Sequence, residues 1–188
     1  IHHVRAYIPV GILSSLGMCM TYQASSGIEV ILVLFFAFLM LNQTNAGLKK
    51  TIIFVAVSLT NYLIALGIFK LFIMHPMSHA QASTSMLPKE ELISGFIRNL
   101  DMYLDYLWHD FGWSGIKICF LLLVAFFLLS ALVQSKINKI LALGIAIIAL
   151  VLGICLSYGT YLVLSQPLTR PRAFIGIGVF TAALAIYV

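Results

Sequence analysis

The chain consists mainly of apolar segments long enough to cross a lipid bilayer, with one sizeable polar stretch between them. A hydrocarbon core of about 30 Å requires roughly 20 helical residues, and a helix satisfies its own backbone N–H and C=O groups inside the membrane. The segments long enough to span alone are residues 51–73, 116–133 and 140–164. The shorter apolar segments are residues 7–21, 28–41 and 173–188. The pattern predicts an all-α, polytopic transmembrane helix bundle with about six spans.

The shorter segments leave part of this topology open. Residues 7–21 and 28–41 can each be a tilted span, a short span or one arm of a re-entrant pair, and we interpret both as spans. Residues 173–188 are still apolar where the sequence stops, and the sequence starts at Ile1 without a signal-peptide pattern. We therefore expect a fragment whose last span is truncated. With 62% hydrophobic and 9% charged residues, the composition excludes a soluble domain.

Basic residues in the short connections orient the bundle. If the spans alternate in direction, one side receives no acidic residue and five basic ones, which are Arg5, Lys49, Lys50, Lys136 and Lys139. Cytoplasmic loops are enriched in Lys and Arg, so this side is predicted to be cytoplasmic. The opposite side receives Glu29, the polar stretch at residues 75–115 and the connector at residues 165–172. The net charge of +5 thus reflects topology together with a basic pair on the outer side, and we expect the lipid bilayer rather than a nucleic acid as partner.

The polar stretch divides the chain into three predicted parts. Residues 1–74 and 116–188 each hold three transmembrane helices, and residues 75–115 form a loop on the outer side. The first part of this loop is rich in Ser and Ala and bounded by prolines, which indicates irregular chain. From Lys89 onward, apolar residues recur at spacings of three and four, which predicts an amphipathic helix at the membrane interface. Polar residues, among them Arg98, Asn99 and Asp101, are expected on its other faces.

Asp101 and Asp105 are the candidate catalytic residues within the loop. They lie one helical turn apart, so their carboxylates are expected on one face, and His109 extends that face. Such a group can deprotonate a hydroxyl or bind a divalent cation. The alternative is a solvated polar face, which is the usual role of charged residues on an amphipathic helix. His75 and His79 have a metal-like spacing only in a helix, which the intervening proline disfavours, so no metal site is predicted.

Arg170 and Arg172 lie beside two prolines in the connector that opens the last span, Arg170 between Pro167 and Pro171 and Arg172 directly after Pro171. They depart from the charge rule, because they are basic residues on the side predicted to be outer. An arginine there can form paired hydrogen bonds with a phosphate. Alternatively, an arginine at the end of a span simply reaches the lipid headgroups. Tyr22 and Gln23, after the first apolar segment, supply hydrogen-bonding groups at the same side, with interface anchoring as the alternative.

Three stretches of the sequence resemble the type II O-antigen glucosyltransferase family of bacteria and phages. They are MTYQAS at residues 20–25, the helix that carries Asp101 to Asp110, and QPLTRPRA at residues 166–173. The resemblance covers the whole chain. It implies a multi-pass protein of the bacterial inner membrane, active in serotype conversion and resembling part of a GT-C glycosyltransferase. Such an enzyme moves glucose from polyprenyl-phosphate glucose to O-antigen of lipopolysaccharide on the periplasmic side, where residues 75–115 are then expected.

The resemblance also implies roles for residues of this chain. The catalytic base of such transferases is expected in a first outer loop, which would precede the first residue here, so the base is expected outside the chain. Arg170 and Arg172 become the best candidates for binding the lipid phosphate. Tyr22 and Gln23 become candidates for substrate contacts. The resemblance implies a polyprenyl-linked sugar and an O-antigen acceptor as substrates, and it indicates no cofactor.

Two other classes of protein remain as alternatives. A lipid-linked saccharide flippase or polymerase also needs spans and an outer basic patch, but it is expected to carry more charge within the membrane or a longer outer loop. A small-molecule transporter is expected to show ionisable residues at mid-membrane depth or an internal repeat. The mid-span polar residues, such as Ser58, Asn61 and Ser157, are few and uncharged. The transferase is therefore the favoured interpretation.

Overall fold

The structure is a computed structural model that describes residues 4–21, 26–44, 46–73, 85–110, 112–167 and 174–188. Within these ranges the chain forms seven α-helices and no β-strand. The helices are α1 (Val4–Thr21), α2 (Ser26–Asn42), α3 (Gly47–Ile68), α4 (Leu92–Asp110), α5 (Ser114–Val133), α6 (Lys139–Leu156) and α7 (Ile175–Tyr187). Three short helical turns accompany them, η2 (Phe69–Ile73), η4 (Lys89–Glu91) and η5 (Gly159–Val163). The prediction of an all-α helix bundle is confirmed.

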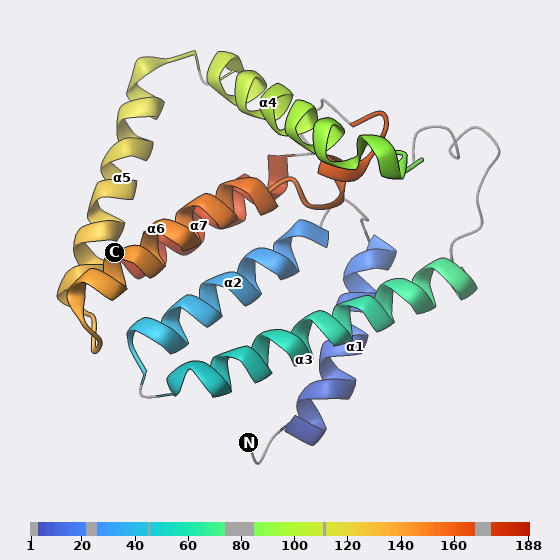
Figure 1. The fold of residues 1–188 in the computed structure, drawn as a ribbon, viewed down its shortest axis with the longest axis horizontal. Helices are drawn as coiled ribbons and strands as arrows, with labels where there is room; N and C mark the ends of the chain where they lie inside the picture. The colour runs from blue at the N-terminus through green and yellow to red at the C-terminus, as the bar shows by residue number, and fades with distance from the viewer. Residues whose placement is uncertain (1–3, 22–25, 45, 74–84, 111, 168–173) are drawn as a thin grey trace.

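Six of the seven helices are apolar along their length. Three of them, Gly47–Ile73, Ser114–Val133 and Lys139–Leu156, are long and apolar enough to cross a membrane, while α1, α2 and α7 contain shorter apolar stretches. α2 lies at the centre, with α3 on one side and α6 and α7 on the other (Figure 1). α1 packs on α3, and α5 packs on α6 and α7. α4 differs, because it runs across the bundle beside η5 (Figure 1).

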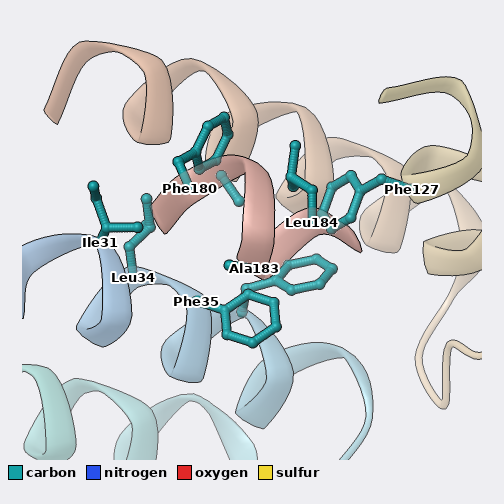
Figure 2. Close-up of a pocket in the computed structure, with 9 residues that line it drawn as sticks. Ile31, Leu34, Phe35, Phe127, Phe180, Ala183 and Leu184 are labelled. Atoms are coloured by element: carbon teal, nitrogen blue, oxygen red, sulfur yellow. The ribbon is translucent and has the colours of Figure 1, made fainter. Parts of the chain in front are cut away.

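The main core lies between α2, α5, α6 and α7. Phe38 of α2, Phe127 of α5 and Tyr187 of α7 form an aromatic group with ring centroids 5.1–5.2 Å apart. Beside this group is a small, entirely apolar pocket of about 20 Å³, and Figure 2 shows side chains from α2, α5 and α7 around it. That volume is close to the space one water molecule occupies. The pocket contains none of the predicted site residues, so it is a packing gap in the core.

Polar contacts join three helices at the end of the bundle away from α4. The buried amide of Asn42 donates hydrogen bonds to the Tyr187 hydroxyl at 2.8 Å and to the Ala131 carbonyl at 3.2 Å. The Lys136 N–H in turn donates to the Asn42 carbonyl at 3.0 Å. Lys139 begins α6 here, and Lys49 lies in the first turn of α3. Basic residues therefore gather at this end, and its cytoplasmic location stays a prediction.

α6 ends earlier than the sequence predicted. The apolar segment at 140–164 was expected to be one helix, but α6 ends at Leu156 and the chain turns into η5. The Ser157 hydroxyl donates back to the Gly153 carbonyl at 2.5 Å, and Gly159 adopts a φ of 53°, a backbone conformation that glycine reaches without strain. Hydropathy did not register this break, because the residues beyond it are apolar again.

α7 crosses the end of α6 in direct backbone contact. A Cβ atom added at Gly176 would lie 1.9 Å from the Ser157 carbonyl oxygen. One turn lower in α6, a Cβ at Gly153 would lie 2.1 Å from the ring of Phe180 in α7. Small residues let helices approach closely where lipid provides no hydrophobic drive for association. These two glycines therefore fix where α6 and α7 meet, and with them the position of η5.

Candidate functional site

The described residues of two polar stretches meet at one end of the bundle, which we call the α4 end. Residues just before η4 pair with the end of η5 and the segment after it, since Leu87 N–H donates to the Val163 carbonyl and Ser165 N–H donates to the Ser85 carbonyl, both at 2.9 Å. The hydroxyls of Ser85 and Ser165 are also hydrogen-bonded to each other. Residues 85–110 of the long loop and residues 165–167 of the connector therefore lie at the same end.

Asn99 attaches α4 to η5. Its buried side-chain amide donates to the carbonyls of Leu162 and Leu164, at 3.1 Å and 2.9 Å. Buried carbonyls need such donors, and one amide group offers two of them. Asn99 was expected on a face away from the apolar residues of this helix, and this was wrong, because it is buried on the side of α4 that faces η5. Spacing alone could not find this role, because the partner carbonyls are more than sixty residues away in the chain.

An aromatic cluster completes this junction. Tyr103 of α4 stacks on Tyr158 at the end of α6, with ring centroids 4.4 Å apart and an interplanar angle of 7°. Phe174 lies edge-on to both rings at 5.7 Å and stacks on Tyr106 at 4.7 Å. Burial raises the pKa of the Tyr103 and Tyr158 hydroxyls above the usual 10.0, so both are neutral at physiological pH. The cluster ties α4 to the chain that leads into α7.

The predicted lipid-phosphate and substrate residues lie outside the described residues. This holds for Arg170, Arg172, Tyr22 and Gln23. The residues that border the arginine connector are described, however. On the N-terminal side of the two arginines, Ser165 is hydrogen-bonded to Ser85. On their C-terminal side, the ring of Phe174 packs on Tyr103 of α4. Both borders of the connector are thus held at the α4 end.

Asp101 and Asp105 lie on the exposed side of α4. The Asp105 carboxylate is 3.2 Å from His109 Nδ1, and these two side chains are 71% and 74% exposed. A polar contact so open to water contributes little to stability. No third acidic or histidine side chain joins them, and no potential metal-binding group of three His, Cys, Asp or Glu is found in the part of the chain that the structure describes. This setting resembles the solvated polar face, and a catalytic role for either aspartate stays a prediction.

A buried carboxyl group at Glu29 was missed as a candidate. One of its oxygens lies 2.8 Å from Ser15 Oγ, and the other is buried without a hydrogen-bond partner. Two residues earlier, Gly27 lies against the carbonyl of Leu156 at the end of α6, which places this carboxyl near the α4 end. An acidic residue in an apolar helix is often functional. The sequence alone shows an acidic residue within an apolar segment, but it does not show that Glu29 contacts Ser15 of α1.

We expect Ser15→Ala to destabilise the protein by about 1–3 kcal/mol, the cost of leaving a buried polar group without its partner. The Ser15 hydroxyl is the hydrogen-bond partner of the buried Glu29 carboxyl. Thermal unfolding of the purified protein in detergent measures the effect. Ser14→Ala is the matched control, because Ser14 is exposed on the same helix, and it should change stability by less than about 0.5 kcal/mol. Equal stability of both variants would contradict this contact.

These observations define a helical membrane protein with a polar, hydrogen-bonded junction at one end of its apolar bundle. A family model described as glucosyl transferase GtrII matches residues 2–188. The chain belongs to this family, and membership implies glucosyltransferase activity. Comparisons with curated proteins and with solved structures found no match. The functional assignment therefore rests on the family match.

Proposed function

We propose that the protein transfers glucose from polyprenyl-phosphate glucose to an O-antigen sugar of lipopolysaccharide at the periplasmic face of the bacterial inner membrane. The family match over residues 2–188 is the observation that supports glucosyl transfer as the activity. The joined polar stretches support the α4 end as the place where a lipid-linked donor is bound. A donor with a membrane-embedded lipid and a polar sugar phosphate needs apolar helices next to a polar surface, and the α4 end combines the two.

In this proposal Arg170 and Arg172 bind the donor phosphate. When the sugar leaves, the lipid phosphate gains negative charge, and a guanidinium group in a poorly solvated site stabilises that charge more than water does. The hydrogen bonds at Ser165 and the ring contacts of Phe174 support this role, because they hold both borders of the connector beside α4. Asp101 and Asp105 are the candidates within these residues for the base that activates the acceptor.

The test is glucosyl transfer from polyprenyl-phosphate glucose to O-antigen, measured in membranes that contain the complete protein. Arg172→Ala and Arg170→Ala are expected to lower the rate by about 10²–10³, the usual effect of removing one group that stabilises transition-state charge. Arg98→Ala is the matched control, because Arg98 is an exposed arginine of α4, and it should leave the rate unchanged.

Protein abundance must be equal in all membranes compared. Unchanged transfer by both connector variants would make the two arginines anchors for lipid headgroups. Failure of the wild-type protein to transfer glucose would favour a saccharide flippase or a transporter instead.

A further inference from the structure

α4 uses only part of its apolar surface to pack on the bundle. Gly95, Asn99 and Tyr103 are buried and recur every fourth residue, so they mark the side that faces η5. A second apolar set consists of Ile93, Ile97, Leu104 and Trp108. These follow one another at spacings of four, seven and four, which places them together along one side of a helix. We call this set the free flank of α4.

The free flank is well exposed within the protein. Exposed fractions are 78% for Ile93, 60% for Ile97, 41% for Leu104 and 65% for Trp108. On its far side begins a polar flank, which consists of Ser94, Arg98, Asp101, Asp105 and His109. α4 therefore has three distinct sides, one packed on η5, one apolar and uncovered, and one polar. A helix with that division fits a boundary between an apolar phase and water.

The free flank is continuous with the surface that α5 presents to lipid. α5 starts at Ser114, just after α4, and its buried residues are Phe127 and Ala131, so most of its apolar surface is uncovered by protein. The two helices meet where the Lys117 ammonium lies 4.0 Å from the centre of the Trp108 ring. Trp113, next to α5, is 74% exposed. Trp and Lys at the end of a span typically lie at the level of the lipid headgroups.

We propose that the free flank of α4 is inserted in the headgroup layer of the same bilayer that α5 crosses. The apolar side chains reach the upper acyl chains, the Trp108 ring and the Lys117 ammonium lie among the phosphates, and the polar flank faces water. α4 is then fixed on two sides, by Asn99 on the bundle and by lipid on the free flank. The sequence suggested that the whole apolar stripe of this helix lies at the membrane interface. Part of that stripe packs on η5 instead, so the proposed lipid contact is limited to the free flank.

The two tryptophans of the chain allow a direct test. In a Trp113→Phe variant of the full chain, Trp108 is the single tryptophan. The variant is reconstituted in phosphatidylcholine vesicles that contain a nitroxide lipid labelled either near the headgroup or near the end of the acyl chain. We expect the shallow label to quench Trp108 at least twofold more strongly than the deep label, and aqueous iodide to quench it several-fold less than a free indole in solution.

Other patterns overturn the proposal. Quenching by iodide as strong as that of free indole places the free flank in water. Quenching by none of the three reagents places it under protein, and stronger quenching by the deep label places α4 inside the hydrocarbon core. Ile97→Lys provides a second measurement in the same background. It should make Trp108 more accessible to iodide, whereas Asp101→Asn on the polar flank should not, and equal accessibility in both variants also overturns the proposal.

Discussion

Replacing Gly176 with alanine is expected to separate the start of α7 from the end of α6. The added methyl group would meet the Ser157 carbonyl oxygen, because a Cβ at this position lies 1.9 Å from that atom. Backbone atoms cannot change rotamer to relieve such a contact, so the helices must move. Overpacking a core by one methylene group costs typically 1–3 kcal/mol, and we expect at least about 3 kcal/mol here. Thermal unfolding of the purified protein in detergent measures the loss.

Gly178→Ala is the matched control on the same helix. Gly178 has no atom within 4 Å of an added Cβ, so the methyl group finds open space. Alanine is a better helix former than glycine by about 0.5–1 kcal/mol, so this variant should be as stable as the wild type or slightly more stable. Equal stability of the two alanine variants would show that α7 does not cross α6 in backbone contact.

The second large effect is expected from Asn99→Asp. The substitution preserves the size of the side chain, but an ionised carboxylate only accepts hydrogen bonds, so the carbonyls of Leu162 and Leu164 lose both donors. Each unsatisfied buried group costs about 1–3 kcal/mol, and the carboxylate adds its own repulsion. We therefore expect α4 to leave η5. Protease cleavage within residues 92–110 of the protein in membranes should become much faster.

The control for this prediction is the reverse exchange on the exposed side of α4. Asp101→Asn also swaps a carboxylate for an amide, but Asp101 is solvated, so the cleavage rate should stay at the wild-type level. Glucosyl transfer by the Asn99→Asp variant, compared with the wild type, shows whether docking of α4 is needed for activity. Slow cleavage of the Asn99→Asp variant would mean that the aromatic cluster alone holds α4 in place.

The sequence predicted the helices well because the constraint that produces them is local. A segment that satisfies its own backbone in lipid must be helical, and the amphipathic helix from Lys89 onward follows the same spacing rule. The end of α6 could not be read in this way, since it depends on the backbone of Gly159 and on the crossing of Gly176 over Ser157. A hydropathy pattern contains no information about either feature.

The candidate site could be predicted only in part. The sequence pointed to the α4 helix and to the connector, but the contacts that join them are made by Asn99, Tyr103 and Phe174. Tyr103 belongs to the apolar pattern that predicted this helix, but spacing does not identify the rings of Tyr158 and Phe174 that it meets. The Asn99 amide carries no spacing signal. Pairing of Glu29 with Ser15 likewise depends on how α1 and α2 pack. Such contacts between distant residues follow from the tertiary arrangement and cannot be inferred from spacing.

The position of α2 at the centre of the bundle has a consequence for biosynthesis. Its buried amide at Asn42 is hydrogen-bonded to Tyr187, a residue 145 positions later in the chain. At about 5–20 residues per second, a ribosome needs roughly 7–30 s to make that stretch. During this time α2 is already at the membrane while its partner has not been synthesised. α2 must therefore wait for α7 before this contact can form, and until then the Asn42 amide, which the native protein buries, needs another partner.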